Sequence, residues 1–207
     1  MNYDTLANAE SIARTVEGLK GRGVEPIVLE SGAEALAKIK ELIPTGASVM
    51  NGSSVTLEEV GYIEYLKTGT HGWNNLKDAI LAEKDPVKQS LLRKESVTSD
   101  YYLGSVHALA ETGEFIIASN SGSQLPHIVF TSSNLIFVVS TKKIIPTLAE
   151  GFARLEQHVL PLEDDHMKRV YGPQSGSKIS KVVIWKDEAV YLKRTVRMLL
   201  VKEKLGF

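Results

Sequence analysis

The sequence predicts an α/β fold built on a largely parallel sheet. Strand-like and helical segments alternate along the chain, several strands are uninterrupted apolar runs, and no internal repeat or low-complexity linker interrupts them. Strands of parallel sheets are buried on both faces, which is why they appear as continuous apolar runs. A chain of 207 residues can bury a sizeable core as one domain.

The predicted elements of the N-terminal half alternate between helix and strand. They are a helix over 4–20, a strand over 24–29, a helix over 31–43, a strand over 47–50 and a helix over 56–66. Ser31 and Glu34 have capping-box spacing, which begins the second helix. The helix over 56–66 is apolar on nearly all sides, and one sheet covers only one side of it. We therefore expect either a homodimer or burial of this helix beneath the N-terminal helices.

The rest of the chain continues the alternation. Helices are expected over 76–84, 86–96 and 147–159, and strands over 100–103, 115–118, 135–139, 182–185 and 195–201. Asp85 is a suitable N-cap because Pro86 follows it at the first helical position. The charged segment that starts at Glu163 is expected to be a surface turn, and 171–180 a Gly/Ser loop.

The stretch 46–66 is the first candidate for a binding site. A strand leads into the loop 51–54, and Thr56 and Glu59 have capping-box spacing, so a helix is expected to begin at once. A helix N-terminus has unpaired amides and partial positive charge, which suits a phosphate, carboxylate or enolate. An ordinary strand–turn–helix with a good cap explains the same pattern, because the spacing matches neither the dinucleotide-binding motif nor the P-loop.

Composition excludes several classes of function. With 24 basic and 25 acidic residues, the net charge of −1 does not favour nucleic-acid binding. No apolar run approaches the length of a membrane span, and the N-terminal residues do not resemble a leader, so a cytoplasmic protein is expected. The absence of cysteine excludes disulfides, thiolate catalysis and a cysteine-held cluster within this chain.

Titratable side chains give a second set of candidates. Glu111 and Glu114 flank a predicted turn, where a partly desolvated carboxylate can act as nucleophile or base. The alternative is that Glu111 is a turn residue whose carboxylate accepts backbone amides. The five histidines show no metal-binding spacing, so neither a metal nor a cofactor is expected. His107 either enters the pocket or is a satisfied, partly buried residue, and the pair Lys142–Lys143 either attracts an anion or is ordinary surface.

Several motifs spread over nearly the whole chain are shared with one protein family. They are GSSVTLEEVG at 52–61, flanked by Ala35–Leu36 and 41–44; Ser99–Asp100; ALAETGE at 108–114; Gly122 with Leu125–His127; the strand 135–139; and RMLLVKEKLGF at 197–207. Together they resemble the LUD (lactate-utilisation, protein C-like) domain family. The resemblance implies a three-layer, Rossmann-like fold similar to the sugar-phosphate isomerase and CoA-transferase superfamily. It also implies a single LUD domain over 1–207, in which 1–22 form an N-terminal helix that packs on the core.

The resemblance also implies a site and a function. Members are linked to oxidation of lactate to pyruvate alongside iron–sulfur partner proteins, and the related CoA-transferases place a nucleophilic carboxylate in the region of Glu111. Where members often carry a basic or Asn-Arg pair, this chain has Ser123-Gln124, which removes a bidentate anion contact. The candidate ligand-binding residues are Gly52, Ser53, Ser54, Thr56, Thr112, Asn120, Ser121, Ser123 and Gln124.

Three hypotheses for the function follow. The first is a protein that binds a small organic or phosphorylated anion and takes part in lactate or related organic-acid metabolism. The second is a non-catalytic subunit that docks an iron–sulfur oxidoreductase. The third is an isomerase or acyl-transferase that uses Glu111.

Overall fold

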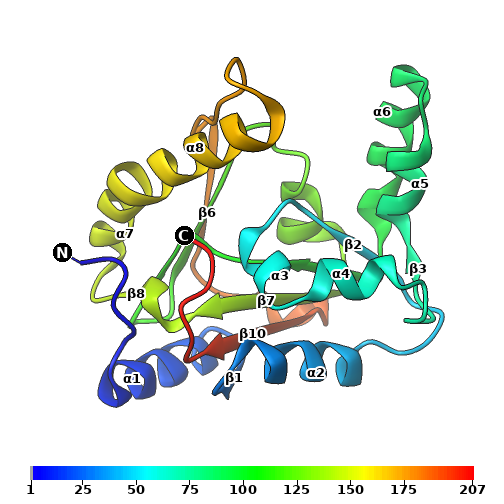
Figure 1. Ribbon diagram of the computed structural model, residues 1–207. Coiled ribbons are helices and arrows are strands. Elements are labelled where there is room, and N and C mark those ends of the chain that lie inside the picture. Colours follow the sequence, from blue (N-terminus) through cyan, green and yellow to red (C-terminus); the bar gives the residue numbers. More distant parts are fainter. Residues whose placement is uncertain (1) are drawn as a thin grey trace.

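The computed structural model describes residues 2–207 and contains two β-sheets (Figure 1). The larger sheet has the strand order β1-β10-β7-β4-β2-β3, and every neighbouring pair is parallel. Its strands are β1 (Glu25–Leu29), β2 (Ser48–Asn51), β3 (Asn74–Asn75), β4 (Tyr101–Gly104), β7 (Asn134–Ser140) and β10 (Thr195–Val201). The predicted α/β, Rossmann-like fold with a largely parallel sheet is confirmed.

A smaller, mixed sheet was not expected from the sequence. It has the order β8-β5-β6-β9, and its strands are β5 (Ala108–Ala110), β6 (Phe115–Ser119), β8 (Ile144–Ile145) and β9 (Lys181–Trp185). β6 is antiparallel to both β5 and β9, whereas β5 and β8 are parallel. β5 and β8 are only three and two residues long, so their pairing depends on tertiary contacts rather than on a local pattern.

Successive side chains of the central strand β7 point to opposite faces of the larger sheet and belong to two different apolar clusters. Leu135, Phe137 and Val139 contact the smaller sheet and α1 (Ala9–Lys20), whereas Ile136 and Val138 contact the helices of the opposite face. Those helices are α2 (Gly32–Leu42), α3 (Val55–Glu59) and α4 (Tyr62–Lys67). The larger sheet is therefore covered on both faces, as its apolar strands require.

The outer face of the smaller sheet is covered by one long helical segment. It consists of α7 (Leu148–Arg154), a π-helical turn η4 (Leu155–Val159) and α8 (Leu160–Tyr171). α7 begins with a capping box between Thr147 and Glu150. The expected end of this helix near 159 is wrong. Pro161 has no N–H to donate, but it lies in the first turn of α8, directly after the wider π-helical turn, and the chain continues as helix.

The remaining elements surround the larger sheet. They are α5 (Leu76–Ala82), α6 (Pro86–Glu95), the 3₁₀ turns η1 (Ser96–Thr98), η3 (Thr141–Lys143) and η5 (Val190–Leu192), and the π-helical turn η2 (His127–Thr131). The predicted N-caps are confirmed for α2, at Ser31, and for α6, at Asp85. Figure 1 shows α5–α6 and α7–α8 at opposite ends of the molecule. None of the helices within 2–207 has the length and apolar character needed to cross a membrane.

The predicted helix over 56–66 is two short helices. Gly61 adopts a left-handed conformation (φ 79°) and separates α3 from α4. The capping box predicted for Thr56 and Glu59 is wrong: α3 begins one residue earlier, and the hydroxyl of its N-cap Ser54 accepts a hydrogen bond from the amide of Leu57 at 3.3 Å. Thr56 is thereby placed inside the first turn, and its hydroxyl is free to contact another element.

The apolar surface of α3 and α4 is covered within one chain. Leu57, Tyr62 and Leu66 are buried against α2 and Trp73. Of the two alternatives expected from the sequence, burial beneath the N-terminal helices therefore accounts for this surface without a second subunit. A homodimer remains a prediction.

Candidate functional site

Three adjoining hollows lie beyond the carboxyl ends of β2, β4 and β6. All three are lined by Gly52, Ser53 and Gln124, and their volumes are about 310, 170 and 70 Å³. We call them the large, the middle and the small hollow. Ligands of parallel sheets bind at this edge, and the two loops that carry most of the candidate ligand-binding residues, 51–54 and 120–124, meet here.

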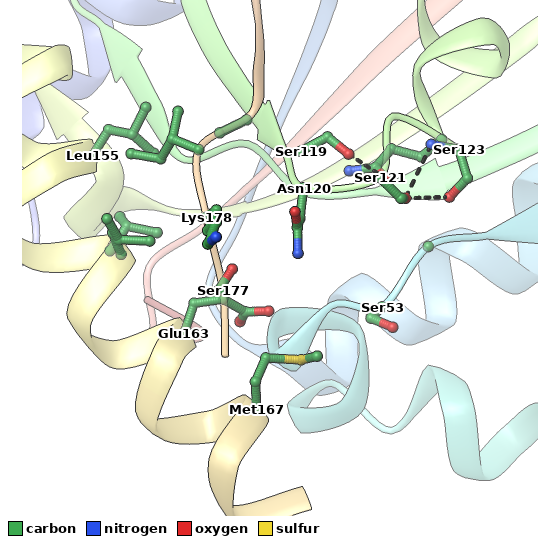
Figure 2. A pocket seen from close by; sticks show the side chains of 16 residues that line it. Ser53, Ser119, Asn120, Ser121, Ser123, Leu155, Glu163, Met167, Ser177 and Lys178 are labelled. Carbon is green, nitrogen blue, oxygen red and sulfur yellow. Dashed lines mark hydrogen bonds between the residues drawn. The ribbon is translucent and has the colours of Figure 1, made fainter. Parts of the chain in front are cut away.

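The large hollow has a mixed polar lining. Figure 2 shows Asn120 between Ser53 on one side and Glu163 and Ser177 on the other. Ser121 and Ser123 lie at its rim and hydrogen-bond to each other at 3.0 Å. Burial raises the pKa of Glu163, which projects from α8. This hollow therefore offers hydroxyl and amide groups and also one acidic side chain.

The middle hollow is cationic. Lys77 of α5 and Arg93 of α6 line it, and no acidic residue does. Burial lowers the pKa of Lys77, whose Nζ donates to the carbonyl of Gly52 at 3.4 Å. Within the described residues, neither Lys77 nor Arg93 forms an ion pair with a carboxylate. An anion placed here therefore meets two positive charges that have no carboxylate in direct contact, although the more distant Glu58 acts electrostatically on Lys77.

Aromatic stacking shapes the floor of the middle hollow. The Tyr102 ring stacks on His127 with centroids 4.8 Å apart, and its hydroxyl accepts from the amide of Gly52 at 3.1 Å. Desolvation lowers the pKa of His127 to about 4, so its imidazole is neutral at pH 7. A Cβ at Gly52 would lie 2.8 Å from the Tyr102 hydroxyl, so only glycine allows this close contact.

The small hollow is lined by hydroxyl groups and lies beside a buried lysine. Its lining includes Ser54, Ser105 and His107. The Nζ of Lys143 donates to the Ser105 hydroxyl at 3.1 Å and to the Thr56 hydroxyl at 3.0 Å. Lys143 is 4% exposed, and burial, together with the charge of Arg154, lowers its pKa to about 7. Its amine is therefore partly neutral at physiological pH.

His107 is held in one tautomer next to this lysine. Its Nδ1 accepts from the amide of Ala118 at 3.1 Å, so the proton is on Nε2. Burial, with the charges of Lys143 and Arg154, lowers its pKa to about 3. His107 is a neutral donor rather than a cation.

The structure brings most of the predicted site residues together. Those that line the hollows are Gly52, Ser53, Ser54, Asn120, Ser121, Ser123 and Gln124. Thr56 is buried behind the small hollow, where its hydroxyl holds Lys143. α3 is only five residues long, so the helix dipole contributes less here than a longer helix would.

Glu111 and Thr112 lie elsewhere, beneath α1. The carboxylate of Glu111 accepts from the Ser11 hydroxyl at 2.5 Å and from Arg14 Nε at 2.6 Å. The hydrogen bond from Arg14 is the main reason that the pKa of Glu111 is lowered. The donors to this carboxylate are thus side chains of α1 and not the backbone amides of the turn that the sequence suggests. This arrangement favours a structural role for Glu111.

A glycine contact explains how α1 approaches this turn. A Cβ at Gly18 would lie 2.5 Å from the carbonyl carbon of Thr112, and one at Gly113 would lie 2.4 Å from the carbonyl carbon of Gly18. Arg22 also donates to the carbonyl of Thr112 at 2.8 Å. The turn is the docking point of α1, and neither Glu111 nor Thr112 lines any of the three hollows.

Sequence reasoning did not select Lys77 and Arg93, and it left Lys143 as either an anion contact or a surface residue. The first two lie on α5 and α6, more than twenty residues from the loop they face, so no local spacing relates them to it. The position of Lys143 just past the carboxyl end of β7 is the one signal that pointed to the site.

Comparisons with known proteins agree with this fold. The sequence model of the LUD domain matches residues 12–173. The structure is similar to the crystal structure of a DUF162 family protein from Deinococcus radiodurans, with 12% sequence identity and a TM-score of 0.55, over 95% of this chain and 98% of that one. The comparison with curated proteins found no match. Because the match to the family covers most of its length, this chain belongs to the LUD domain family.

Proposed function

We propose that this LUD domain binds a small organic or phosphorylated anion and takes part in lactate or related organic-acid metabolism. The observation that carries the proposal is the lining of the middle hollow, which has two cationic side chains, Lys77 and Arg93, and no acidic one. An anion gains most where positive charge is partly desolvated and not already paired.

The size of the hollows limits the ligand. A volume of about 170 Å³ suits a metabolite of a few carbon atoms, since one water molecule occupies about 30 Å³ in the liquid. Ser53 and Gln124 line all three hollows. A longer ligand can therefore extend from the middle into the small hollow and still contact the Ser53 hydroxyl and the Gln124 amide. The charged group is expected at Lys77 and Arg93, and the uncharged part toward Ser54 and Ser105.

A thermal-shift experiment with matched ligands tests this proposal. Lactate, pyruvate, acetate and inorganic phosphate are tested, with lactamide and acetamide as the neutral analogues of lactate and acetate. A bound ligand raises the melting temperature in proportion to the logarithm of its concentration. We expect at least one anion to stabilise the protein and its amide not to do so.

Variants locate the site. Arg93→Met removes one charge of the middle hollow, and Lys94→Met removes a charge from the neighbouring position, which is exposed like Arg93 but does not line the hollow. The stabilisation is expected to decrease in Arg93→Met and to persist in Lys94→Met. Equal shifts with anions and amides, or no shift with any ligand, would contradict the proposal; the second result would favour a subunit that docks an iron–sulfur protein.

A further inference from the structure

We propose that Ser105 and Lys143 form a nucleophile–base pair that cleaves a small anionic ester or thioester. This activity rests on the proposed function in one respect: the charged group of the substrate binds Lys77 and Arg93 in the middle hollow. The acyl carbonyl then lies in the adjoining small hollow, since both hollows are lined by Gly52, Ser53, Tyr102 and Gln124.

The geometry of the pair supports this role. Ser105 lines the small hollow, whereas Lys143 does not, and the Nζ of Lys143 lies 3.1 Å from the Ser105 hydroxyl. A serine needs an adjacent base to become a nucleophile, and a lysine serves as that base when it is desolvated. The Thr56 hydroxyl, 3.0 Å from the same Nζ, fixes the direction of the amine.

The C-terminal segment shields this lysine from solvent. A Cβ at Gly206 would lie 2.1 Å from the Thr56 hydroxyl and 3.1 Å from the Nζ of Lys143, so the backbone of this segment packs directly over both groups. The amide of Gly206 donates to the carboxylate of Glu59 at 2.6 Å, which fixes the segment to α3. Lys143 is therefore covered by the C-terminal segment, while its Nζ contacts the hydroxyl of Ser105, a residue that lines the small hollow.

The charges around Lys143 keep part of it neutral. Arg154 of α7 and Lys142 of η3 oppose a proton on its amine, whereas Glu59 of α3 favours one. His107 is neutral at pH 7. Within the described residues, no carboxylate forms an ion pair with Lys143, although Lys142 pairs with Asp4. The surroundings therefore lower the cost of losing the proton, as a general base requires.

The reaction balances with water as the only other reactant. The Ser105 oxygen bonds to the acyl carbon as its proton moves to the Lys143 amine. The carbonyl electron pair then returns and expels the alkoxide or thiolate, which takes the proton from the Lys143 ammonium. Water attacks the acyl-serine in the same way, passing its proton through Lys143 to the departing Ser105 oxygen. The net change is hydrolysis of the ester or thioester to an acid and an alcohol or thiol.

A fluorophosphonate probe tests the pair without knowledge of the substrate. Its phosphorus reacts with an activated serine and releases fluoride, and the adduct is located by peptide mass spectrometry. We expect the adduct on Ser105, with a rate that rises between pH 6 and 8 as the Lys143 amine loses its proton. Ser105→Ala is expected to abolish it, and Lys143→Met to slow it by about 10²-fold or more. Ser90→Ala and Lys67→Met, at exposed positions outside the site, are expected to react like the wild type.

Each result decides the proposal. An adduct on another serine, no adduct in the folded wild type, or a rate that does not change with pH would overturn it. If Lys143→Met does not fold, Ser105→Ala and the pH profile of the wild type still decide. Failure of this proposal is distinct from failure of anion binding, because the melting-temperature shift that acetate or inorganic phosphate gives in the wild type depends on Lys77 and Arg93, which line the middle hollow and not the small one.

Discussion

Replacing Glu111 with glutamine is expected to weaken the attachment of α1 without affecting the hollows. The carboxylate is 17% exposed and receives charge-assisted hydrogen bonds from Ser11 and Arg14. Such bonds contribute about 1.5–3 kcal/mol when buried. Arg14 is 49% exposed, which reduces its share, and glutamine retains one acceptor oxygen. The expected loss in the free energy of unfolding is about 1–2 kcal/mol.

Thermal melting at several pH values measures this loss. In a domain of this size, the melting temperature decreases by about 2–4 °C for each kcal/mol. The lowered pKa of Glu111 means that its carboxylate contributes fully above the ordinary value of 4.5 and that this contribution is lost as the pH falls through the lower value in the folded protein. The difference between Glu111→Gln and the wild type should therefore decrease in acid.

A matched control uses the other carboxylate that pairs with Arg14. Glu10 is 81% exposed, so Glu10→Gln is expected to cost less than about 0.5 kcal/mol. If Glu111→Gln melted like the wild type and lost anion binding or probe labelling, the structural role of Glu111 would be refuted and a role in the site favoured.

Three further substitutions test other parts of the structure. Gly18→Ala places a Cβ 2.5 Å from the backbone of Thr112, so it is expected to lower the melting temperature more than Glu111→Gln does, as differential scanning calorimetry would show. Gly52→Ala places a Cβ 2.8 Å from the Tyr102 hydroxyl; it is expected to displace the loop and reduce anion binding at least tenfold in titration calorimetry. Lys143→Met removes a buried charge that forms no ion pair and is expected to stabilise the protein by on the order of 1 kcal/mol or more in denaturant unfolding. Because the pKa of Lys143 is lowered from 10.5 to about 7, this gain should be largest at or below pH 7 and decrease as the pH rises toward 10.5.

Elements with a strong local signal could be predicted from the sequence. The all-apolar run at 135–139 is the central strand β7, and Ser31 and Asp85 are N-caps as their spacing indicates. The start of α3 could not be predicted as well, because Ser53, Ser54 and Thr56 are all capable caps. Ser54 is the N-cap, and the Thr56 hydroxyl instead accepts a hydrogen bond from Lys143, which is 87 residues away in the sequence.

The candidate site shows the same division between local and long-range information. The loops at 51–54 and 120–124 could be placed together because both follow strands. The position of Glu111 could not, because its partners Ser11 and Arg14 lie 100 and 97 residues away. The positive charge of the middle hollow was missed for a related reason: Lys77 faces the loop from a helix whose position over β2 is set by packing.

The most direct test of the central claim is a calorimetric titration of the anion that gives the largest thermal shift. The dissociation constant would be measured for the wild type, for the double variant Lys77→Met/Arg93→Met and for the control Lys94→Met at one pH and ionic strength. If the anion binds in the middle hollow, the double variant should bind at least tenfold more weakly while the control binds like the wild type, since about 1.4 kcal/mol corresponds to a factor of ten. A double variant that folds and binds the anion as tightly as the wild type would contradict the claim.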